Sequence, residues 1–435
     1  MEKIISFISA EVLKEDFSIY NSGEKCDLFL FENINAESFD KIVSYLKSLE
    51  GFTFVCDNKI ENNLFYFCKV KETFVCAGYF PVNKTLRIVF DNNTYLPDII
   101  KNDSGDNQTR FWQFEVDHKL IDCGMCYIMQ TKTGDFFIID SAHTYSINDC
   151  DRIYDFLRER TPSGKKIHIK GWFLSHGHED HTAQFMNYVR YHMDDTELDM
   201  VYFNFISNDH RDGSDWMYSG KNYVNMLYSL MDEHPEIPVC RLHTGMYFYA
   251  DNIRFDVLCS HEDVFPNDNS NYNDSSVTLM MQAEGTKVLF PGDAGGEESV
   301  LMETRYPGFL KSDIVQVAHH GHFGTSVEFY DLVDADVALF ATTQIKFDEE
   351  LPHYKANERA IELAKHVFIA SNGTVEFPLP YKDGCFKVFP DETFESFQGV
   401  YNLWGYEYTL EHKKKLYEEY LSRGGKPLDE YKDML

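Results

Sequence analysis

The chain has 435 residues, of which 43% are apolar and 15% aromatic, a composition typical of a globular protein and not of a disordered one. Its 71 acidic and 40 basic side chains give a formal net charge of −31. Such a surface repels a long polyanion, and no block of five basic residues interrupts it, so long nucleic acid is disfavoured and a small-molecule substrate is favoured.

Hydropathy and cysteine usage indicate a soluble protein of a reducing compartment. No window approaches the roughly 18 uninterrupted apolar residues that a membrane helix needs. The ten cysteines lie mostly inside apolar runs, as small buried hydrophobes do, and the close pair Cys123 and Cys126 has no second CxxC to complete a zinc site. We therefore expect a cytoplasmic protein with no membrane span, and the sequence leaves a homo-oligomer open.

Residues 1–108 are predicted to form a small α+β accessory domain. Apolar residues recur at helical spacing between Asn35, which is placed to cap a helix, and Gly51, which is placed to end it. Short β-rich runs such as LFYFCKV and TLRIVFD follow, separated by turn-forming residues. The polar segment 91–110 is the predicted linker to the next domain.

Residues 109–380 are predicted to form a second, larger domain. Strands and helices alternate there, with several hairpins, and this order predicts sheets covered by helices in an αββα sandwich. The whole chain is thus expected to be of the α+β class, with a small N-terminal α+β domain. Residues 381–435 are expected to be a C-terminal extension containing a charged helix.

The segment SHGHEDH, residues 175–181, directly follows the apolar run IHIKGWFL. Imidazole and carboxylate are the ligands that divalent zinc, manganese or iron prefer when no thiolate is offered. A loop at a strand end can turn His176 and His178 toward one ion while Asp180 and His181 reach a second. The segment therefore predicts half of a binuclear metal site.

Other ligand-type residues also follow predicted strands. Asp293 lies in the glycine-flanked turn of LFPGDAGG, His319 and His320 begin the group in VAHHGHFGTS, and His261 follows VLCS. A carboxylate at Asp293 could bridge two ions. Four strand ends carrying such residues predict the mouth of a single site.

In this order, HxHxDH, then PGDA, then HHG, the motifs resemble those of the metallo-β-lactamase superfamily. The segments NDSSVTLMMQAEGTKVLFPGDA, VAHHGHFGTS and ASNGTVEF more narrowly resemble the branch that contains ComEC-type hydrolase domains and phosphorylcholine esterases. The resemblance covers roughly residues 112–378. It implies the αββα fold and a hydrolase with two divalent metal ions, zinc in the first place and manganese or iron as alternatives.

The resemblance also implies a role for each motif residue. His176 and His178 would bind the first metal, Asp180 and His181 the second, and Asp293 would bridge them. A second-metal ligand is expected from the HHG motif.

We favour His319 for that position, with His320 as its rival. The remaining histidine is left to bind substrate or to protonate a leaving group. Asp180 and His320 are thus the residues expected to act directly in catalysis.

The middle of the chain departs from the superfamily pattern. The third ligand of the first metal has no clear match, and His261 is the candidate that stands in suitable order. Asp140 of FFIIDSAHTY matches the motif whose carboxylate supports the metal loop without coordinating. His143 and His210 are further candidates for the pocket wall, although a surface or core position is the simpler interpretation of each.

Two metals can share a hydroxide, lower the pKa of that water and polarise the bond under attack. The favoured hypothesis is a binuclear hydrolase of a phosphodiester or phosphate-ester small molecule. The alternatives are hydrolysis of a carbonyl substrate, such as a lactone, thioester or β-lactam, an iron-dependent oxidoreductase on the same fold, and a non-catalytic scaffold. The complete set of ligand residues argues against the scaffold.

Overall fold

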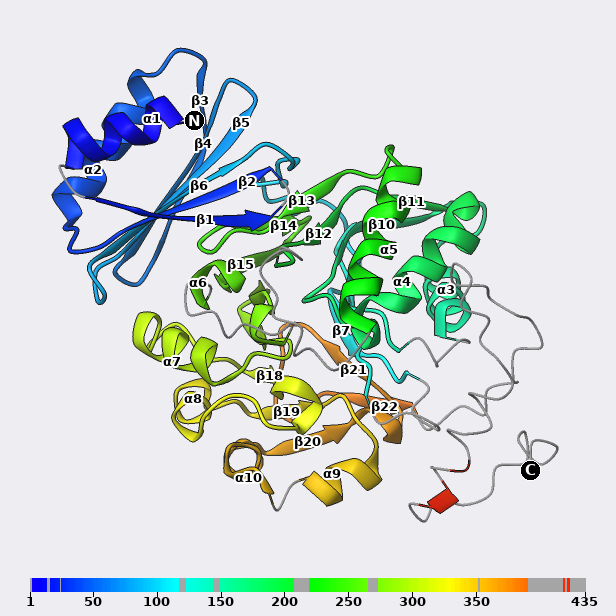
Figure 1. Cartoon of the computed structure of the whole chain (residues 1–435). Coiled ribbons are helices and arrows are strands. Elements are labelled where there is room, and N and C mark those ends of the chain that lie inside the picture. The colour runs from blue at the N-terminus through cyan, green and yellow to red at the C-terminus, as the bar shows by residue number, and fades with distance from the viewer. Residues whose placement is uncertain are drawn as a thin grey trace.

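The computed structural model contains three β-sheets with helices on their outer faces (Figure 1). It describes residues 2–13, 16–23, 25–116, 123–143, 149–206, 219–264, 273–350, 353–389, 418 and 421–422. His210 and most of the predicted C-terminal extension lie outside these ranges. Within the described residues, no helix has the length and apolar character required to cross a membrane.

The N-terminal sheet is six-stranded and antiparallel, in the order β1-β2-β6-β5-β4-β3. Its strands are β1 (Ser18–Gly23), β2 (Cys26–Phe31), β3 (Phe52–Ile60), β4 (Asn63–Val70), β5 (Thr73–Phe80) and β6 (Thr85–Asp91). Helices α1 (Glu2–Phe7) and α2 (Ala36–Ser48) cover one face. Helix α1 continues directly into a π-helical turn at Ile8–Leu13. The Asn35 side chain caps α2 by accepting a 2.9 Å hydrogen bond from the Ser38 amide, as predicted.

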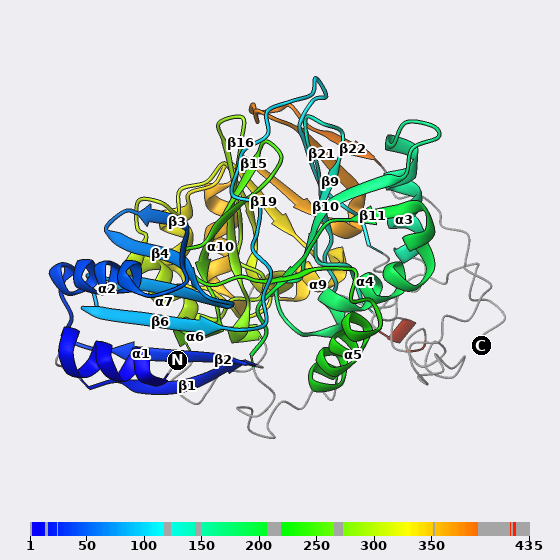
Figure 2. The same cartoon turned by 90° about the horizontal axis from the view of Figure 1, so that it is seen from above.

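The central strands of this sheet are buried on both faces, which explains why β4 and β5 are apolar almost throughout. Tyr66 and Cys68 of β4 face the helices, whereas Phe65 and Phe67 face the rest of the molecule. Figure 2 shows the N-terminal sheet lying against the remaining two sheets, with its helices on the outside. The N-terminal unit therefore packs as a layer on the larger part of the chain.

The second sheet has the order β13-β12-β10-β9-β8-β7-β21-β22, with β11 paired to β10. Its strands are β7 (Arg110–Gln113), β8 (Tyr127–Gln130), β9 (Phe136–Ile139), β10 (Ile167–Phe173), β11 (Thr196–Leu198), β12 (Val201–Phe203), β13 (Val239–Arg241), β21 (Thr374–Pro378) and β22 (Lys387–Phe389). Strands β9, β10, β12 and β13 run parallel. Helices α3 (Asp149–Arg160), α4 (Glu179–His192) and α5 (Ser219–Glu233) cover its outer face.

The third sheet has the order β14-β15-β16-β17-β18-β19-β20. Its strands are β14 (Tyr247–Ala250), β15 (Ile253–Cys259), β16 (Thr278–Ala283), β17 (Thr286–Phe290), β18 (Ile314–Gln316), β19 (Val337–Phe340) and β20 (His366–Ile369). The first four are antiparallel and β17 to β20 run parallel. The helices of this half are α6 (His261–Val264), α7 (Gly296–Arg305), α8 (Val327–Val333), α9 (Gln344–Glu350) and α10 (Lys355–Leu363).

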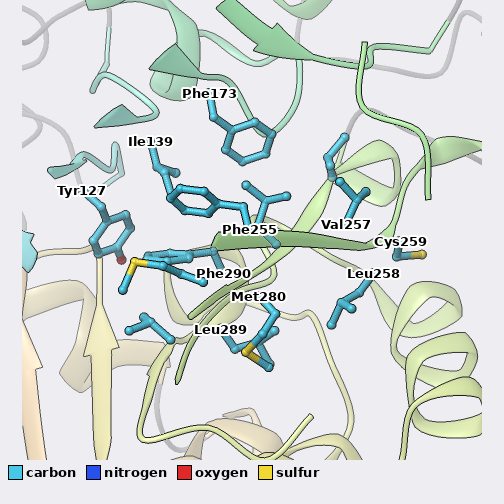
Figure 3. Close-up of a cluster of buried hydrophobic side chains, with 14 of the residues drawn as sticks. Tyr127, Ile139, Phe173, Phe255, Val257, Leu258, Cys259, Met280, Leu289 and Phe290 are labelled. Atoms are coloured by element: carbon cyan, nitrogen blue, oxygen red, sulfur yellow. The ribbon is translucent and has the colours of Figure 1, made fainter. Parts of the chain in front are cut away.

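The second and third sheets pack face to face through aromatic side chains (Figure 3). Phe137 of β9 stacks on Phe255 of β15 with ring centroids 4.3 Å apart, and Tyr127 lies 5.2 Å from Phe290. Alternate residues of the same strands, such as Ile138, point to the helices on the other face. The predicted fold class, an α+β chain with αββα layering and a small N-terminal α+β unit, is confirmed.

The parallel strands of the two central sheets end at a common edge. In the second sheet β9 ends just before Asp140, and β10 ends two residues before Ser175. In the third sheet β17 ends three residues before Asp293, and β18 leads to the HHG segment. The carboxyl ends of parallel strands are adjacent, so these four loops converge on one place.

Buried charges fasten the N-terminal sheet to the rest of the chain. Arg87 of β6 donates to Asp263 at 2.7 Å, and Arg305 of α7 also pairs with Asp263. His243 lies between Asp91 of β6, at 3.2 Å, and Glu262, at 2.6 Å. Because burying a charge is costly unless it is paired, this network fixes how the two units fit together.

The two ion pairs of His243, with Asp91 and with Glu262, form a clamp that we call the His243 clamp. It predicts a loss of stability at alkaline pH. Burial alone would lower the pKa of His243, but Glu262 and Asp91 outweigh it and raise the pKa from 6.5 to about 9. Below pH 6.5 the ring is charged in the folded and the unfolded chain, so the stabilisation is complete. It declines as the pH rises from 6.5 through about 9, a change on the order of 3 kcal/mol.

We expect His243→Gln to lower the thermal midpoint at pH 6.5 and to flatten its dependence on pH between 6.5 and 9.5. Differential scanning calorimetry across that range measures both effects. His234→Gln, which removes a partly exposed pair with Glu236, serves as the control. An unchanged slope in His243→Gln would show that the clamp carries no charge.

Candidate metal centre

The loop after β10 brings His176 and His178 together at the common edge. The Nε2 atom of His176 lies 3.1 Å from Nδ1 of His178 and 3.7 Å from Oδ2 of Asp293. One ligand atom from each of these three buried residues lies within 4.8 Å of the others. Burial and the neighbouring His181 hold the pKa of His176 well below its ordinary value, which leaves a neutral imidazole ready to bind a cation.

A second cluster adjoins the first and shares Asp293 with it. Its four buried members are Asp180, His181, Asp293 and His320. The Oδ2 atom of Asp293 lies 3.4 Å from Nε2 of His181 and 3.6 Å from Nε2 of His320. The Oδ2 atom of Asp180 lies 3.0 Å from Nε2 of His320. The arrangement thus offers two adjoining sets of donors with one carboxylate between them.

The electrostatics of Asp293 suit a position between cations. Burial would raise the pKa of this carboxyl, but the surrounding imidazoles, led by His181 and His320, hold it well below its usual range. Asp293 Oδ1 is buried and accepts no hydrogen bond within the described part of the chain. A buried, ionised and partly unsatisfied carboxylate is costly without a cation beside it.

The ring protons of two histidines point away from the site. His181 donates from Nδ1 to Oδ2 of Asp140 at 2.9 Å, and His320 donates from Nδ1 to the carbonyl oxygen of Ala341 at 2.9 Å. Each neutral ring therefore presents an unprotonated Nε2 to the site, and these two atoms are only 3.2 Å apart. Two lone pairs repel at this distance, so a cation between them or an added proton is required.

Left-handed backbone geometry aims several of these side chains. Asp140 has φ 55°, and its carboxylate accepts hydrogen bonds from the amide and hydroxyl of Ser175 at 2.7 and 2.9 Å. His319 and His320 have φ 52° and 55°, followed by Gly321 at 86°. Residues other than glycine rarely adopt this conformation, and its cost is tolerated where the fold requires the direction it produces.

The structure brings His320, and not His319, into the second cluster, which differs from the preference stated from the sequence. The preference assumed that the first histidine after the strand turns inward. Three consecutive left-handed residues instead place His320 beside Asp180, while His319 lies 3.9 Å from Asp293. His319 is 14% exposed and contacts the exposed ring of Phe323, so these two residues form the accessible rim of the site.

His261 does not join either ligand group, although it follows β15 at the same edge. Strand β15 lies two places from β17, with β16 between them, and strands are spaced about 4.8 Å apart. This places His261 about 10 Å along the edge from the strand that leads to Asp293. Its Nδ1 atom hydrogen-bonds the carbonyl oxygen of Asn204 at 3.0 Å.

Two further residues lie near the clusters. His143 is buried, and its charge interactions include Asp180 and His320; burial lowers its pKa to about 4. Asn273, to which sequence reasoning gave no role, donates from Nδ2 to Nε2 of His319 at 3.2 Å. The NDSS segment belongs to one of the motifs named above, but only the structure shows that its first residue lies beside the HHG turn.

Comparison with known protein families finds no match, and no curated protein matches the chain. Solved structures with a similar fold include YhfI from Bacillus subtilis, a metallo-beta-lactamase fold protein, at 11% identity and a TM-score of 0.37, covering 60% of this chain and 96% of that chain.

In two further solved structures, the alignment with this chain covers only about half of the other protein. CmlA, a diiron beta-hydroxylase from Streptomyces venezuelae, has 11% identity and a TM-score of 0.40 over 63% of this chain. A long-form RNase Z from yeast has 9% identity and a TM-score of 0.37 over 76% of this chain. The alignments span 55% and 54% of those proteins. Similarity at this level carries no argument about activity, which we take from the site itself.

The Asp140 carboxylate should control metal affinity by orienting His181. We expect Asp140→Asn to weaken binding of the second ion by about 10–100-fold, because the single oxygen of an amide cannot accept from both His181 and the Ser175 amide, as the two oxygens of Asp140 do. Asparagine tolerates the left-handed backbone at this position, so the fold should persist. Isothermal titration of the metal-stripped protein with Zn²⁺ measures the effect.

Asp251→Asn is the matched control, because Asp251 is also a buried aspartate with positive φ but bonds Thr131 and Thr133 instead. It should leave both zinc-binding steps unchanged. Equal zinc affinity in Asp140→Asn and in the wild type would contradict the orienting role.

Proposed function

We propose that this chain is a binuclear metal-dependent hydrolase whose substrate is a small phosphodiester or phosphate ester. The observation that supports it most directly is the convergence of the four buried donors Asp180, His181, Asp293 and His320, in which the Nε2 atoms of His181 and His320 lie 3.2 Å apart. Structural zinc sites are closed and usually rich in cysteine, whereas this donor set consists of imidazoles and carboxylates beside an exposed rim. These features fit a catalytic centre.

The residues present fit two ions. His176 and His178 would hold the first, Asp180, His181 and His320 the second, and Asp293 would serve both. Two divalent ions in such a site lower the pKa of bound water toward neutrality and polarise the oxygen of the bond under attack. Zinc is the expected metal, with manganese or iron as alternatives.

The chain itself would orient the metal ligands and exclude water from them. Asp140 and the Ala341 carbonyl fix the two imidazoles of the second cluster, and the shared carboxylate of Asp293 lies between the clusters. His319 and Phe323 stand at the accessible rim, where a substrate group would pass. His143, kept neutral by burial, can donate or accept one hydrogen bond near Asp180.

The phosphate-ester class rests on sequence. The NDSS, PGDA and HHG segments resemble the ComEC-type and phosphorylcholine esterase branch, and a net charge of −31 disfavours a long nucleic acid. A small or membrane-derived phosphate ester meets both conditions. A site lined by imidazoles also offers several hydrogen-bond donors and acceptors for phosphate oxygens.

The test combines metal analysis with a substrate panel of a bis-aryl phosphate, an aryl phosphorylcholine, a lactone, a thioester and a chromogenic β-lactam. We expect about two equivalents of metal and chelator-sensitive hydrolysis of the phosphate esters. Asp293→Asn should reduce that hydrolysis by at least about a hundredfold, because loss of a ligand exceeds the loss of a residue that only orients one.

Asp313→Asn is the control, since Asp313 lies at the opposite end of β18, where its side chain accepts a hydrogen bond from the Lys287 amide. Hydrolysis confined to carbonyl substrates would contradict the phosphate assignment. A single equivalent of iron without zinc or manganese would favour an oxidoreductase. Full activity in Asp293→Asn would refute the metal mechanism.

A further inference from the structure

The first ligand group is short of protein donors when compared with the second. His176, His178 and the shared Asp293 form the first group, whereas the second group has four members. Two buried oxygen atoms close to the HHG turn accept no hydrogen bond within the described residues, namely Oδ1 of Asp293 and Oδ1 of Asn273. A buried oxygen without a partner is costly, and a cation beside these two atoms would remove that cost.

The strand order places Asn273 between His261 and the metal clusters. Asn273 begins a short 3-10 turn, Asn273–Ser275, that leads into β16, and β16 pairs with both β15 and β17. Because β16 runs antiparallel to its neighbours, its start lies at the edge where β15 and β17 end. Asn273 is therefore one strand away from the strand that leads to Asp293, and His261 is two strands away.

Hydrogen bonds tie this segment to two of the metal-binding loops. The Ser276 hydroxyl accepts from the amide of Asp293 at 3.0 Å. The amide of Val277 donates to the carbonyl oxygen of Ser175, the residue before His176, at 2.9 Å. A Cβ at Gly292 would lie 3.1 Å from Ser276 and 3.2 Å from Ser175, so the three loops pack closely at this glycine.

The orientation of the Asn273 amide is set by its neighbour. His319 donates from Nδ1 to the carbonyl oxygen of Phe323 at 2.6 Å, which leaves Nε2 as an acceptor. Nδ2 of Asn273 donates to that Nε2 at 3.2 Å. The amide oxygen is then the atom directed away from His319, and it has no hydrogen-bond partner among the residues that the structure describes.

We propose that Oδ1 of Asn273 is the remaining protein ligand of the first metal site, in the place for which the sequence offered His261. This inference rests on the proposed binuclear centre. The first ion would then be held by two imidazoles, one shared carboxylate and one neutral amide oxygen. The second ion has the full carboxylate of Asp180 in addition to its share of Asp293.

The consequence is an asymmetric centre. An amide oxygen is a hard, uncharged donor, so it neutralises none of the charge of a divalent ion and suits manganese better than an all-imidazole site does. The first ion is therefore the weaker one and the first to leave in the presence of a chelator. Substitution of Asn273 should therefore change the affinity for the first ion and leave the affinity for the second ion unchanged.

The experiment uses the metal-loaded full-length protein and follows metal content by mass spectrometry during dialysis against graded EDTA. The wild type should release its two equivalents in two steps. Asn273→Ala should retain about one equivalent, with affinity for the other at least about tenfold weaker. Asn273→Asp, which adds a charge at constant size, should retain two and release the first several-fold more slowly.

Asn372→Ala is the control, because Asn372 also belongs to a short 3-10 turn, Ala370–Asn372, but bonds Gln344 on the surface. It should behave as the wild type does. Cobalt(II) substitution gives a second readout, since loss of an oxygen ligand alters the visible absorption of one of two ions.

Two results would overturn the inference, and they differ from each other. Wild-type metal content and release in both Asn273 variants would remove Asn273 from the ligand set and leave the binuclear hydrolase standing. Absence of bound metal in the wild type would refute the proposed function together with this inference.

Discussion

The close approach of the imidazole rings of His181 and His320 is the constraint on which the site depends. Their Nε2 atoms lie 3.2 Å apart, beside the two buried and ionised carboxylates of Asp180 and Asp293. Without a cation the carboxylates draw protons onto these rings: burial alone would lower the pKa of His181, yet Asp293, Asp180 and Asp140 together raise it well above its usual value. A divalent ion bound there would replace those protons and leave both rings neutral and both carboxylates ionised.

The fold produces this arrangement by bringing the ends of parallel strands from two sheets to one edge. The aromatic packing of Phe137 on Phe255 holds the sheets face to face, so the loops that follow β10 and β17 meet across the gap. The left-handed backbone at Asp140 then directs its carboxylate to His181, and the left-handed backbone at His320 directs its imidazole into the second cluster. The strain of these conformations lies where ligands are aimed, and the rigid sheets on either side sustain it.

Much of this could be predicted from the sequence. The αββα layering follows from the alternation of strands and helices, and the ligand-type residues of SHGHEDH lie together at a strand end because their spacing is local. What could not be predicted depends on geometry beyond the local chain. The choice of His320 over His319 follows from three consecutive residues with positive φ, which only Gly321 announces in the sequence.

The position of His261 illustrates a different limit of sequence reasoning. Its place after β15 suggested a ligand, but the pairing of β16 between β15 and β17 moves it two strands from the centre and brings Asn273 closer. Strand order in a mixed sheet is a long-range property. Likewise, the continuous apolar strands of the N-terminal unit indicate burial on two faces. The sequence does not say what covers the second face, and the structure shows that it packs on the larger part of the chain.

The most direct test of the binuclear centre is a crystal structure of the zinc-loaded protein with anomalous data collected at the zinc edge. The account predicts two anomalous peaks about 3.5–4 Å apart, one beside His176 and His178 and the other between His181 and His320, with Asp293 contacting both. A single peak remote from Asp293, or no peak at this edge of the sheets, would contradict it.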